Sequence, residues 1–303
     1  MLKLFFQYFI FPGLAFAAVV GLLAGWVDRK VTARLQWRVG PPWYQNFMDI
    51  LKLTGKEVIV PEGARLVFML SPYFGLVGAG LAAAMLGNSI ISSAYGFTGD
   101  LFVFIYLLTM PALALILGAS SSRNPLASVG ASREMKLFMA YELPFLLAIV
   151  AMVIKTGSIQ LTKIIYHQQM LSSNIISVSG ALAFAVSLFC MQAKLGIVPF
   201  DASEAEQEIM AGVLIEYSGL LLALFKLCKA VMLYTVPLFL VILFMGKDLS
   251  LAFLAVKYTA LLVFIILVKN TGPRMRIDQA MRFFWRIPTV AAAAAVVLAL
   301  YRM

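Results

Sequence analysis

The sequence has few residues that can hold a redox cofactor or a metal ion. It contains two cysteines and one histidine in 303 residues, without a Cys-x-x-Cys pair. Iron–sulfur clusters need sets of cysteine ligands, and a bis-histidine haem needs two histidines on facing helices. The chain alone therefore cannot hold either group. Because Cys190 and Cys228 lie in apolar stretches, we expect both thiols to be structural, and we place His167 in a polar loop.

Charged residues are also scarce. Only 13% of the residues are charged, 62% are hydrophobic, and the mean hydropathy is +0.95. A soluble domain carries about 25% charged and about 45–50% apolar residues. These values exclude a soluble globular protein, a disordered chain and a nucleic-acid binder with a basic folded surface. They predict an all-α, polytopic integral membrane protein that forms one transmembrane domain in a lipid bilayer.

Long apolar runs determine the number of spans. Since about 20 apolar residues cross a bilayer core, the chain has room for about eight transmembrane helices. The sixth run is too long for one straight helix, so we expect a start buried in the preceding loop, a tilt or a break near Pro237. The last run is short, and Ala291–Ala295 predict close packing there. The predicted spans are 4–27, 66–91, 100–119, 135–154, 174–195, 213–245, 249–268 and 286–302.

Basic residues predict the orientation. Most of the 24 lysines and arginines lie in the segments after the first, third, fifth and seventh spans. Because cytoplasmic loops carry the positive excess, we expect four large cytoplasmic loops, both termini outside, and a multi-pass location in the cell (plasma) membrane. The net charge of +10 then requires no acidic substrate.

Residues 43–58 form no span. Apolar residues recur at helical spacing from Trp43 to Val58, with polar residues such as Asp49 between them. This pattern predicts an amphipathic helix in the membrane interface. It serves either as a surface anchor or as the floor of a cytoplasmic docking site.

Five acidic residues crowd into residues 201–216, which we name the acidic loop: Asp201, Glu204, Glu206, Glu208 and Glu216. The loop is short and lies between two apolar spans, so some of these carboxylates must lie at membrane depth. Spacing predicts that Glu204 and Glu208 share a helix face and repel each other. Crowding of this kind favours reversible proton uptake near neutral pH.

Some charged residues lie well inside predicted spans, away from the span ends: Glu142, Lys226, Lys229 and Lys257. Charges at this depth are costly and usually face a bundle interior or a wet cavity. A single helix through the sixth span would place Glu216 and Lys226 on one stripe of small residues, with Lys229 outside it. Snorkelling to an interface is the alternative for the lysines. The pattern predicts a proton or cation pathway that opens to the cytoplasm.

Four strings in the expected cytoplasmic loops are more specific. They are Arg38-Val39-Gly40-Pro41 with Asp49 following; Gly130-Ala131-Ser132-Arg133 followed by Tyr141-Glu142; Pro199-Phe200-Asp201-Ala202-Ser203-Glu204 leading to Glu216-Tyr217-Ser218-Gly219; and Pro273-Arg274-Met275-Arg276-Ile277-Asp278-Gln279. In this order they resemble the membrane subunit of respiratory complex I that abuts the quinone site, its H or first subunit. That family includes the matching subunits of group 4 membrane-bound [NiFe] hydrogenases and of formate hydrogenlyase. The resemblance covers residues 28 to 286.

The sequence motifs identify the family more clearly than the branch within it. Ser132-Arg133-Glu134 and Lys226 resemble the hydrogenase branch, whereas Tyr141 and the Arg-x-Arg-x-Asp-Gln string resemble complex I. We favour the hydrogenase-like branch. The alternatives are the quinone-site subunit of a complex I, in which quinone would bind, and a stand-alone ion transporter.

The resemblance implies a coupling subunit with no catalytic centre and no cofactor of its own. A peripheral arm of [NiFe]-hydrogenase-like and iron–sulfur subunits would dock on the cytoplasmic loops and carry the iron–sulfur clusters and the [NiFe] centre. Redox-driven protonation changes would pass to antiporter-like membrane subunits that move protons or sodium ions.

The resemblance also assigns roles to individual residues. No metal ligand is expected. Asp49, Asp278 and Lys257 are further candidate residues of the functional site. Arg38, Arg133, Arg274 and Arg276 would face the peripheral arm. The pathway would comprise the matched carboxylates Glu142, Asp201, Glu204, Glu206, Glu208 and Glu216. The helical stripe described above adds Lys226 to it.

Overall fold

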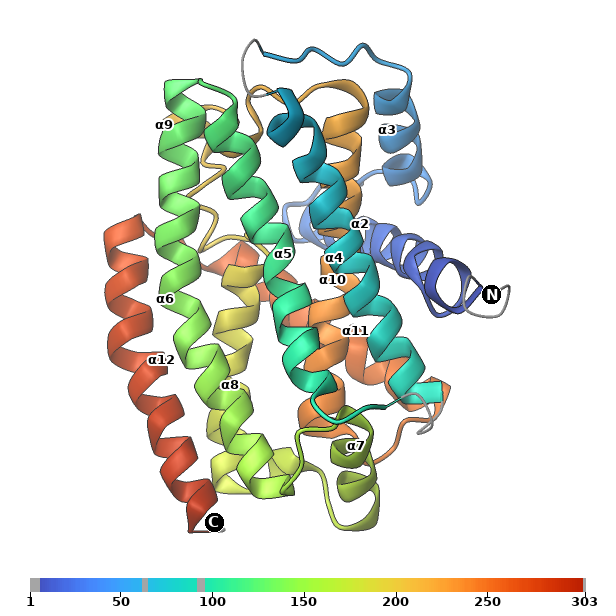
Figure 1. Ribbon diagram of the computed structural model, residues 1–303, viewed down its shortest axis with the longest axis vertical. Helices are drawn as coiled ribbons and strands as arrows, with labels where there is room; N and C mark the ends of the chain where they lie inside the picture. The colour runs from blue at the N-terminus through green and yellow to red at the C-terminus, as the bar shows by residue number, and fades with distance from the viewer. Residues whose placement is uncertain (1–5, 62–64, 92–95, 302–303) are drawn as a thin grey trace.

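The computed structural model describes residues 6–61, 65–91 and 96–301, without the side chains of Glu206 and Gln207. Within these residues the regular elements are all helical (Figure 1). They are η1 (Phe6–Ile10), α2 (Leu14–Leu35), α3 (Gln45–Thr54), α4 (Arg65–Ile91), α5 (Asp100–Ser121), α6 (Pro125–Thr156), α7 (Leu161–Met170), η3 (Asn174–Ile176), α8 (Val178–Lys194), α9 (Glu206–Ile209), η4 (Gly212–Leu214), α10 (Gly219–Met245), α11 (Leu251–Thr271) and α12 (Ile277–Leu300).

Each predicted span corresponds to one helix. Seven helical segments are long and apolar enough to cross a membrane: η1 with α2, α4, α5, α6, α10, α11 and α12. The eighth, α8, is apolar but has only 17 residues. The all-α, multi-pass architecture is therefore confirmed. Positions 4, 5 and 302 of the predicted spans lie outside the described residues, and the sidedness in the membrane stays a prediction.

Several predicted boundaries are wrong. Helices α6 and α12 begin at Pro125 and Ile277, ahead of the predicted starts at 135 and 286, because charged residues continue both helices beyond the apolar run. The interfacial helix covers only Gln45–Thr54. The stretch read as a polar loop around His167 is helix α7, whose buried face includes Ile164 and Ile165.

The sixth span begins later than predicted and is not broken at Pro237. Residues 213–218 form a turn and an irregular segment, so a start buried in the loop is confirmed, and α10 runs unbroken from Gly219. Proline at 237 removes the hydrogen bond to the carbonyl four residues earlier. The hydroxyl of Tyr258 on α11 donates to that carbonyl, on Leu233, at 3.2 Å. The neighbouring helix thus satisfies the group that the proline exposes.

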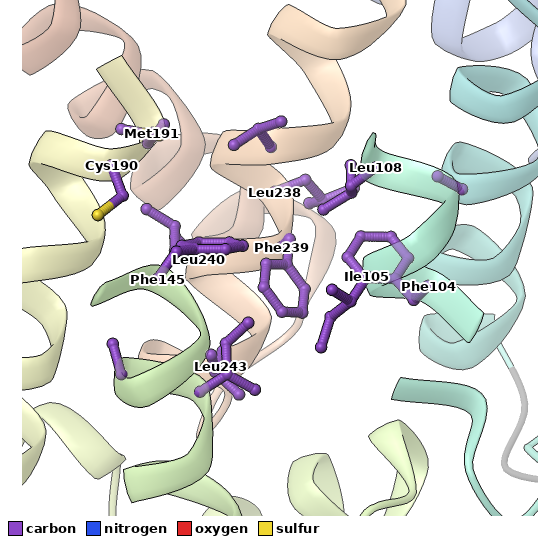
Figure 2. Packing of buried hydrophobic residues seen from close by; sticks show 14 of the residues in the cluster. Phe104, Ile105, Leu108, Phe145, Cys190, Met191, Leu238, Phe239, Leu240 and Leu243 are labelled. Carbon is purple, nitrogen blue, oxygen red and sulfur yellow. The ribbon is translucent and has the colours of Figure 1, made fainter. Parts of the chain in front are cut away.

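Helix α10 is the centre of the bundle. Its apolar side chains are buried along most of its length, in contrast to α11, most of whose side chains are not buried. In Figure 2, Leu238 and Phe239 of α10 lie between Phe104 and Leu108 of α5 on one side and Phe145 of α6 on the other. The two cysteines are buried free thiols within this apolar packing, consistent with a structural role.

Helices α6, α8 and α12 pack together at one flank (Figure 1). Ala292 and Ala295 of α12 are fully buried, and α12 packs along α6 and α8. The close packing predicted from the alanine run is confirmed, because methyl-sized side chains let the helices approach.

The crossing of α2 and α10 at Gly21 yields a first prediction. A Cβ atom at Gly21 would lie 2.0 Å from the carbonyl oxygen of Ala230. Gly21→Ala therefore forces the two backbones apart, and we expect it to cost about 1–3 kcal/mol of stability, as overpacking does. Thermal denaturation in detergent measures the loss. Gly55→Ala is the control, because a Cβ there meets its nearest atom at 3.9 Å. Equal melting of the two variants would contradict the contact.

Candidate functional site

The acidic loop and its flanks hold together the loops at one end of the bundle. These segments belong to the four loops that the charge pattern assigns to the same side of the membrane, so their association supports that grouping. The joining hydrogen bonds run from Asn124 to Glu216, from Ile59 to Ser218 and from Met275 to Pro199.

Two carboxylates of the acidic loop bind arginines near its surface. Arg274 donates to both oxygens of Asp201, from Nε at 2.8 Å and from a terminal nitrogen. Arg133 of α6 donates to Glu208 and to the carbonyl of Ala202. Charge-assisted hydrogen bonds of this kind are stronger than those between neutral groups. Two of the four arginines expected to face a peripheral arm therefore bind the acidic loop instead.

The other two predicted arginines are exposed. The backbone N–H of Arg276, which precedes the first residue of α12, donates to the side-chain oxygen of Gln279 at 3.2 Å. Among the described residues, no carboxylate lies within ion-pair distance of Arg38 or Arg276. Both guanidinium groups remain available at the surface of this end.

Glu204 turns inward, away from Glu208. Its carboxylate binds the ammonium group of Lys229 on α10. The prediction that Glu204 and Glu208 share a helix face is wrong, because α9 spans only Glu206–Ile209 and Glu204 precedes it. Lys229, which the helical stripe excluded, is the lysine that the acidic loop reaches.

The predicted stripe from Glu216 to Lys226 is also wrong. Since α10 begins at Gly219, Glu216 lies in the turn before the helix and accepts a hydrogen bond from Asn124. Lys226 is exposed and lines a cavity that it shares with Lys229.

A second ion pair lies deeper in the bundle. Lys194 at the end of α8 donates to Glu142 of α6 at 2.9 Å, and its side chain is 2% exposed. The ammonium group also lies 4.9 Å from the ring centre of Phe145 and 5.6 Å from that of Tyr141, within cation–π range. The other oxygen of Glu142, Oε1, is buried and has no hydrogen-bond partner among the described residues. The sequence identified Glu142 as a charge inside a span but did not identify Lys194 as its partner.

Glu134 is a buried carboxylic acid that the sequence analysis did not select. It lies on α6 and is 7% exposed. Together with Lys194, Ser203, Glu204 and Lys229 it lines an internal cavity of about 40 Å³. Its burial was not recognisable from the sequence, because the string Ser132-Arg133-Glu134 was interpreted as part of a cytoplasmic loop.

A larger cavity of about 450 Å³ lies between α2, α3 and α10. Its charged lining residues are Asp28, Arg29, Asp49, Glu204, Lys226 and Lys229. Asp49 is partly buried, which raises its pKa, but hydrogen bonds from Arg29 and Gln45 outweigh this burial and lower the pKa overall. Asp28 binds Lys269 of α11 at 2.7 Å. This cavity therefore meets the acidic loop at Glu204.

The remaining candidates lie apart from these groups. Lys257 donates to the carbonyls of Met245 and Asp248, both at 2.8 Å, and so caps the far end of α10, as the snorkelling alternative expects. Asp278 is exposed in the first turn of α12. The side chain of Glu206 lies outside the described residues. Within the described part of the chain, no three His, Cys, Asp or Glu side chains gather as metal ligands.

The chain is similar to known proteins over nearly its whole length. The family described as NADH dehydrogenase matches residues 9–300. The H subunit of the NADH-quinone oxidoreductase of Thermomicrobium roseum is 33% identical, over 89% of this chain and 88% of that protein. The corresponding protein of Geobacillus kaustophilus is 31% identical, over 88% and 84%. A solved chain of the membrane-bound sulfane sulfur reductase, an archaeal respiratory membrane complex, is 31% identical with a TM-score of 0.88, over 98% of this chain and 99% of that chain.

The buried pair of Lys194 and Glu142 yields a second prediction. Lys194→Met removes the ammonium group and leaves a buried carboxylate without its partner, which costs about 3–5 kcal/mol. We expect Glu142→Gln, added to Lys194→Met, to recover part of that loss because it removes the unpaired charge. Denaturation of the purified protein in detergent measures each variant, and Lys136→Met on the exposed face of α6 is the control. Additive losses in the double variant would show that the two groups are not coupled.

Proposed function

Because the chain belongs to the NADH dehydrogenase family, as a multi-pass membrane subunit of a respiratory complex related to complex I, we propose that it is a coupling subunit. It carries no catalytic centre. It connects a redox reaction in a peripheral arm with ion movement in the membrane, within a hydrogenase-like oxidoreductase complex.

The observation that carries this proposal is the series of ion-paired groups that leads inward from the acidic loop. Asp201 pairs with an arginine near the surface, Glu204 pairs with Lys229 of α10, and Glu142 pairs with a buried lysine of α8. In a medium of low dielectric constant, a change of one charge alters the energy of neighbouring charges by several kcal/mol. Electron transfer beside the loop would therefore change the protonation of the series as a set.

The partners follow from this arrangement. Iron–sulfur and [NiFe]-hydrogenase-like subunits would dock on the cytoplasmic loops, where Arg38 and Arg276 are exposed. Those subunits would supply the iron–sulfur clusters and the [NiFe] centre. Antiporter-like membrane subunits beside the bundle would receive the protonation change from Glu142 and move protons or sodium ions across the cell membrane.

The quinone-site subunit of a complex I is the second candidate. The cavity of about 450 Å³ favours it, because ligand pockets typically measure about 300–1,000 Å³. The bacterial relatives are named for NADH-quinone oxidoreductases. A stand-alone ion transporter is not supported, because the relatives are subunits of larger complexes.

The choice between these candidates can be tested at Ala230, which lines the cavity. Ala230→Leu fills part of the space, and Ala255→Leu on the exposed face of α11 is the control. We expect the purified complex to transfer electrons to protons or sulfane sulfur, and Ala230→Leu to leave that turnover unchanged. Reduction of added quinone by the wild-type complex, lost in Ala230→Leu alone, would favour the complex I candidate.

The coupling role can be tested by comparing Glu204→Gln with Glu208→Gln. Glu204 binds Lys229 of α10 and its side chain is 27% exposed, whereas the side chain of Glu208 is 47% exposed and binds Arg133. We expect Glu204→Gln and Glu142→Gln to keep the peripheral subunits but to lower ion uptake per turnover, because each removes a titratable group of the series. Glu208→Gln should keep normal uptake. The measurements are subunit content by mass and ion uptake in vesicles across pH.

A docking role of the acidic loop predicts a different result. It expects Glu204→Gln to lose the peripheral arm while transport per assembled complex stays normal. That outcome would contradict the coupling role of this carboxylate.

A further inference from the structure

Glu134 lies where two ion pairs approach each other inside the bundle. Polar and charged groups from several elements face it. Ser203, whose side chain hydrogen-bonds to the Glu134 carboxyl, and Glu204 belong to the acidic loop, Lys229 to α10, Lys194 to α8 and Tyr141 to its own helix. Glu134 is only 7% exposed, and burial of an ionisable group costs free energy. A functional role would explain why the protein keeps a carboxyl group at this position.

The cavity beside Glu134 can hold water. It measures about 40 Å³, and one water molecule needs about 10–15 Å³ of such space. A buried water also needs two to four polar partners. Glu134, Ser203, Glu204, Lys229 and Lys194 all line this space, so about two or three waters would find enough partners. Apolar side chains such as Leu108, Phe225 and Met232 form the rest of the lining, so ordered water would gather at the polar side of the cavity, against Glu134.

Glu134 also bridges a gap in the series. Glu204 binds Lys229 at the loop end of the bundle, whereas Glu142 lies about 12 Å beyond Glu134 along the axis of α6. A direct transfer over that separation is not possible, since proton transfer requires hydrogen-bond reach or one bridging water. Lys194 lines the cavity and donates to Glu142, so it joins the water site to the deeper pair.

We propose that Glu134 is a proton-holding residue of the chain and that ordered water in this cavity connects it to Glu204 and to the Glu142–Lys194 pair. This inference rests on the proposed coupling function. In the first step the O–H bond of a protonated Glu204 breaks and an O–H bond forms on Glu134, which leaves Glu204 as a carboxylate beside Lys229. In the second step an N–H bond of Lys194 breaks and an O–H bond forms on Glu142, while the proton of Glu134 passes through the cavity water to Lys194 and restores its ammonium group. Lys229 stays protonated throughout, and no electron moves on this chain.

Ser203 positions the carboxyl group of Glu134. The Ser203 side chain is 4% exposed and comes from the acidic loop, so a movement of that loop changes its hydrogen bond to Glu134. The loop thus has a mechanical as well as an electrostatic connection to this residue.

The test is Glu134→Gln in the assembled complex, reconstituted in vesicles. Glutamine keeps the shape and the hydrogen bond but cannot carry a proton. We expect normal subunit content and a fall in ion uptake per turnover of about 100-fold, the low end of what a positioned proton-transfer group contributes. Glu134→Asp should restore part of the uptake with an altered pH profile. Lys136→Gln, exposed on the same helix, is the control.

Unchanged uptake in Glu134→Gln, with uptake impaired in Glu142→Gln and Glu204→Gln, would overturn this inference and leave the coupling function standing. Unchanged uptake in all three variants would overturn the coupling function itself.

A second measurement does not depend on transport. In redox-difference infrared spectra of the complex, we expect the C=O band of a protonated carboxyl that shifts in deuterated water. The band should be absent in Glu134→Gln and displaced in Ser203→Ala, which keeps the carboxyl and removes its hydrogen bond. If Glu134→Gln does not assemble, Ser203→Ala and Glu134→Asp carry the test, and an unshifted band in both would overturn the assignment.

Discussion

An ionised side chain in the interior of an apolar helix bundle is stable only where an opposite charge or a set of polar groups lies against it. The described interior of this protein obeys that constraint at each depth. Lys229 has Glu204, and Lys194 has Glu142 together with two aromatic rings. The Lys229–Glu204 pair is partly exposed, whereas the Lys194–Glu142 pair is buried. The relative position of α6 and α8 depends on the buried pair, because separating it would leave a charge in the apolar interior.

The same constraint governs the backbone. A proline inside a helix leaves a carbonyl without its donor, and at Pro237 and Pro72 a tyrosine hydroxyl takes that place. The hydroxyl of Tyr258 donates to the carbonyl of Leu233, four residues before Pro237. The hydroxyl of Tyr217 donates to the carbonyl of Phe68, four residues before Pro72. Tyr217 is largely buried, and burial raises its pKa to about 12, so it stays a neutral donor at any physiological pH. The helices therefore remain continuous, and the bundle stays rigid enough to hold ion pairs at fixed separations.

Prediction from the sequence succeeded where a local property decides the outcome. Long apolar runs located the eight helices, and Glu142 was recognisable as a carboxylate inside an apolar run. It failed where contacts between helices decide. Helical periodicity placed Glu216 on the same helix face as Lys226, because no local sequence signal indicates that α10 begins only at Gly219. The pairing of Glu204 with Lys229 and the burial of Glu134 arise from α6 and α10 packing against the acidic loop.

The acidic loop divides its carboxylates between two environments. Asp201 and Glu208 bind arginines, Arg274 and Arg133, which compensate their charges. Glu204 binds Lys229 of α10 and lines two cavities, one with Asp49 and Lys226 and one with Glu134. A charge placed beside the loop would therefore act through Glu204 on Lys229 and on the charged groups that share its two cavities. Glu204 is the carboxylate that connects the loop with the bundle, and the arginine pairs of Asp201 and Glu208 hold the backbone around it in place.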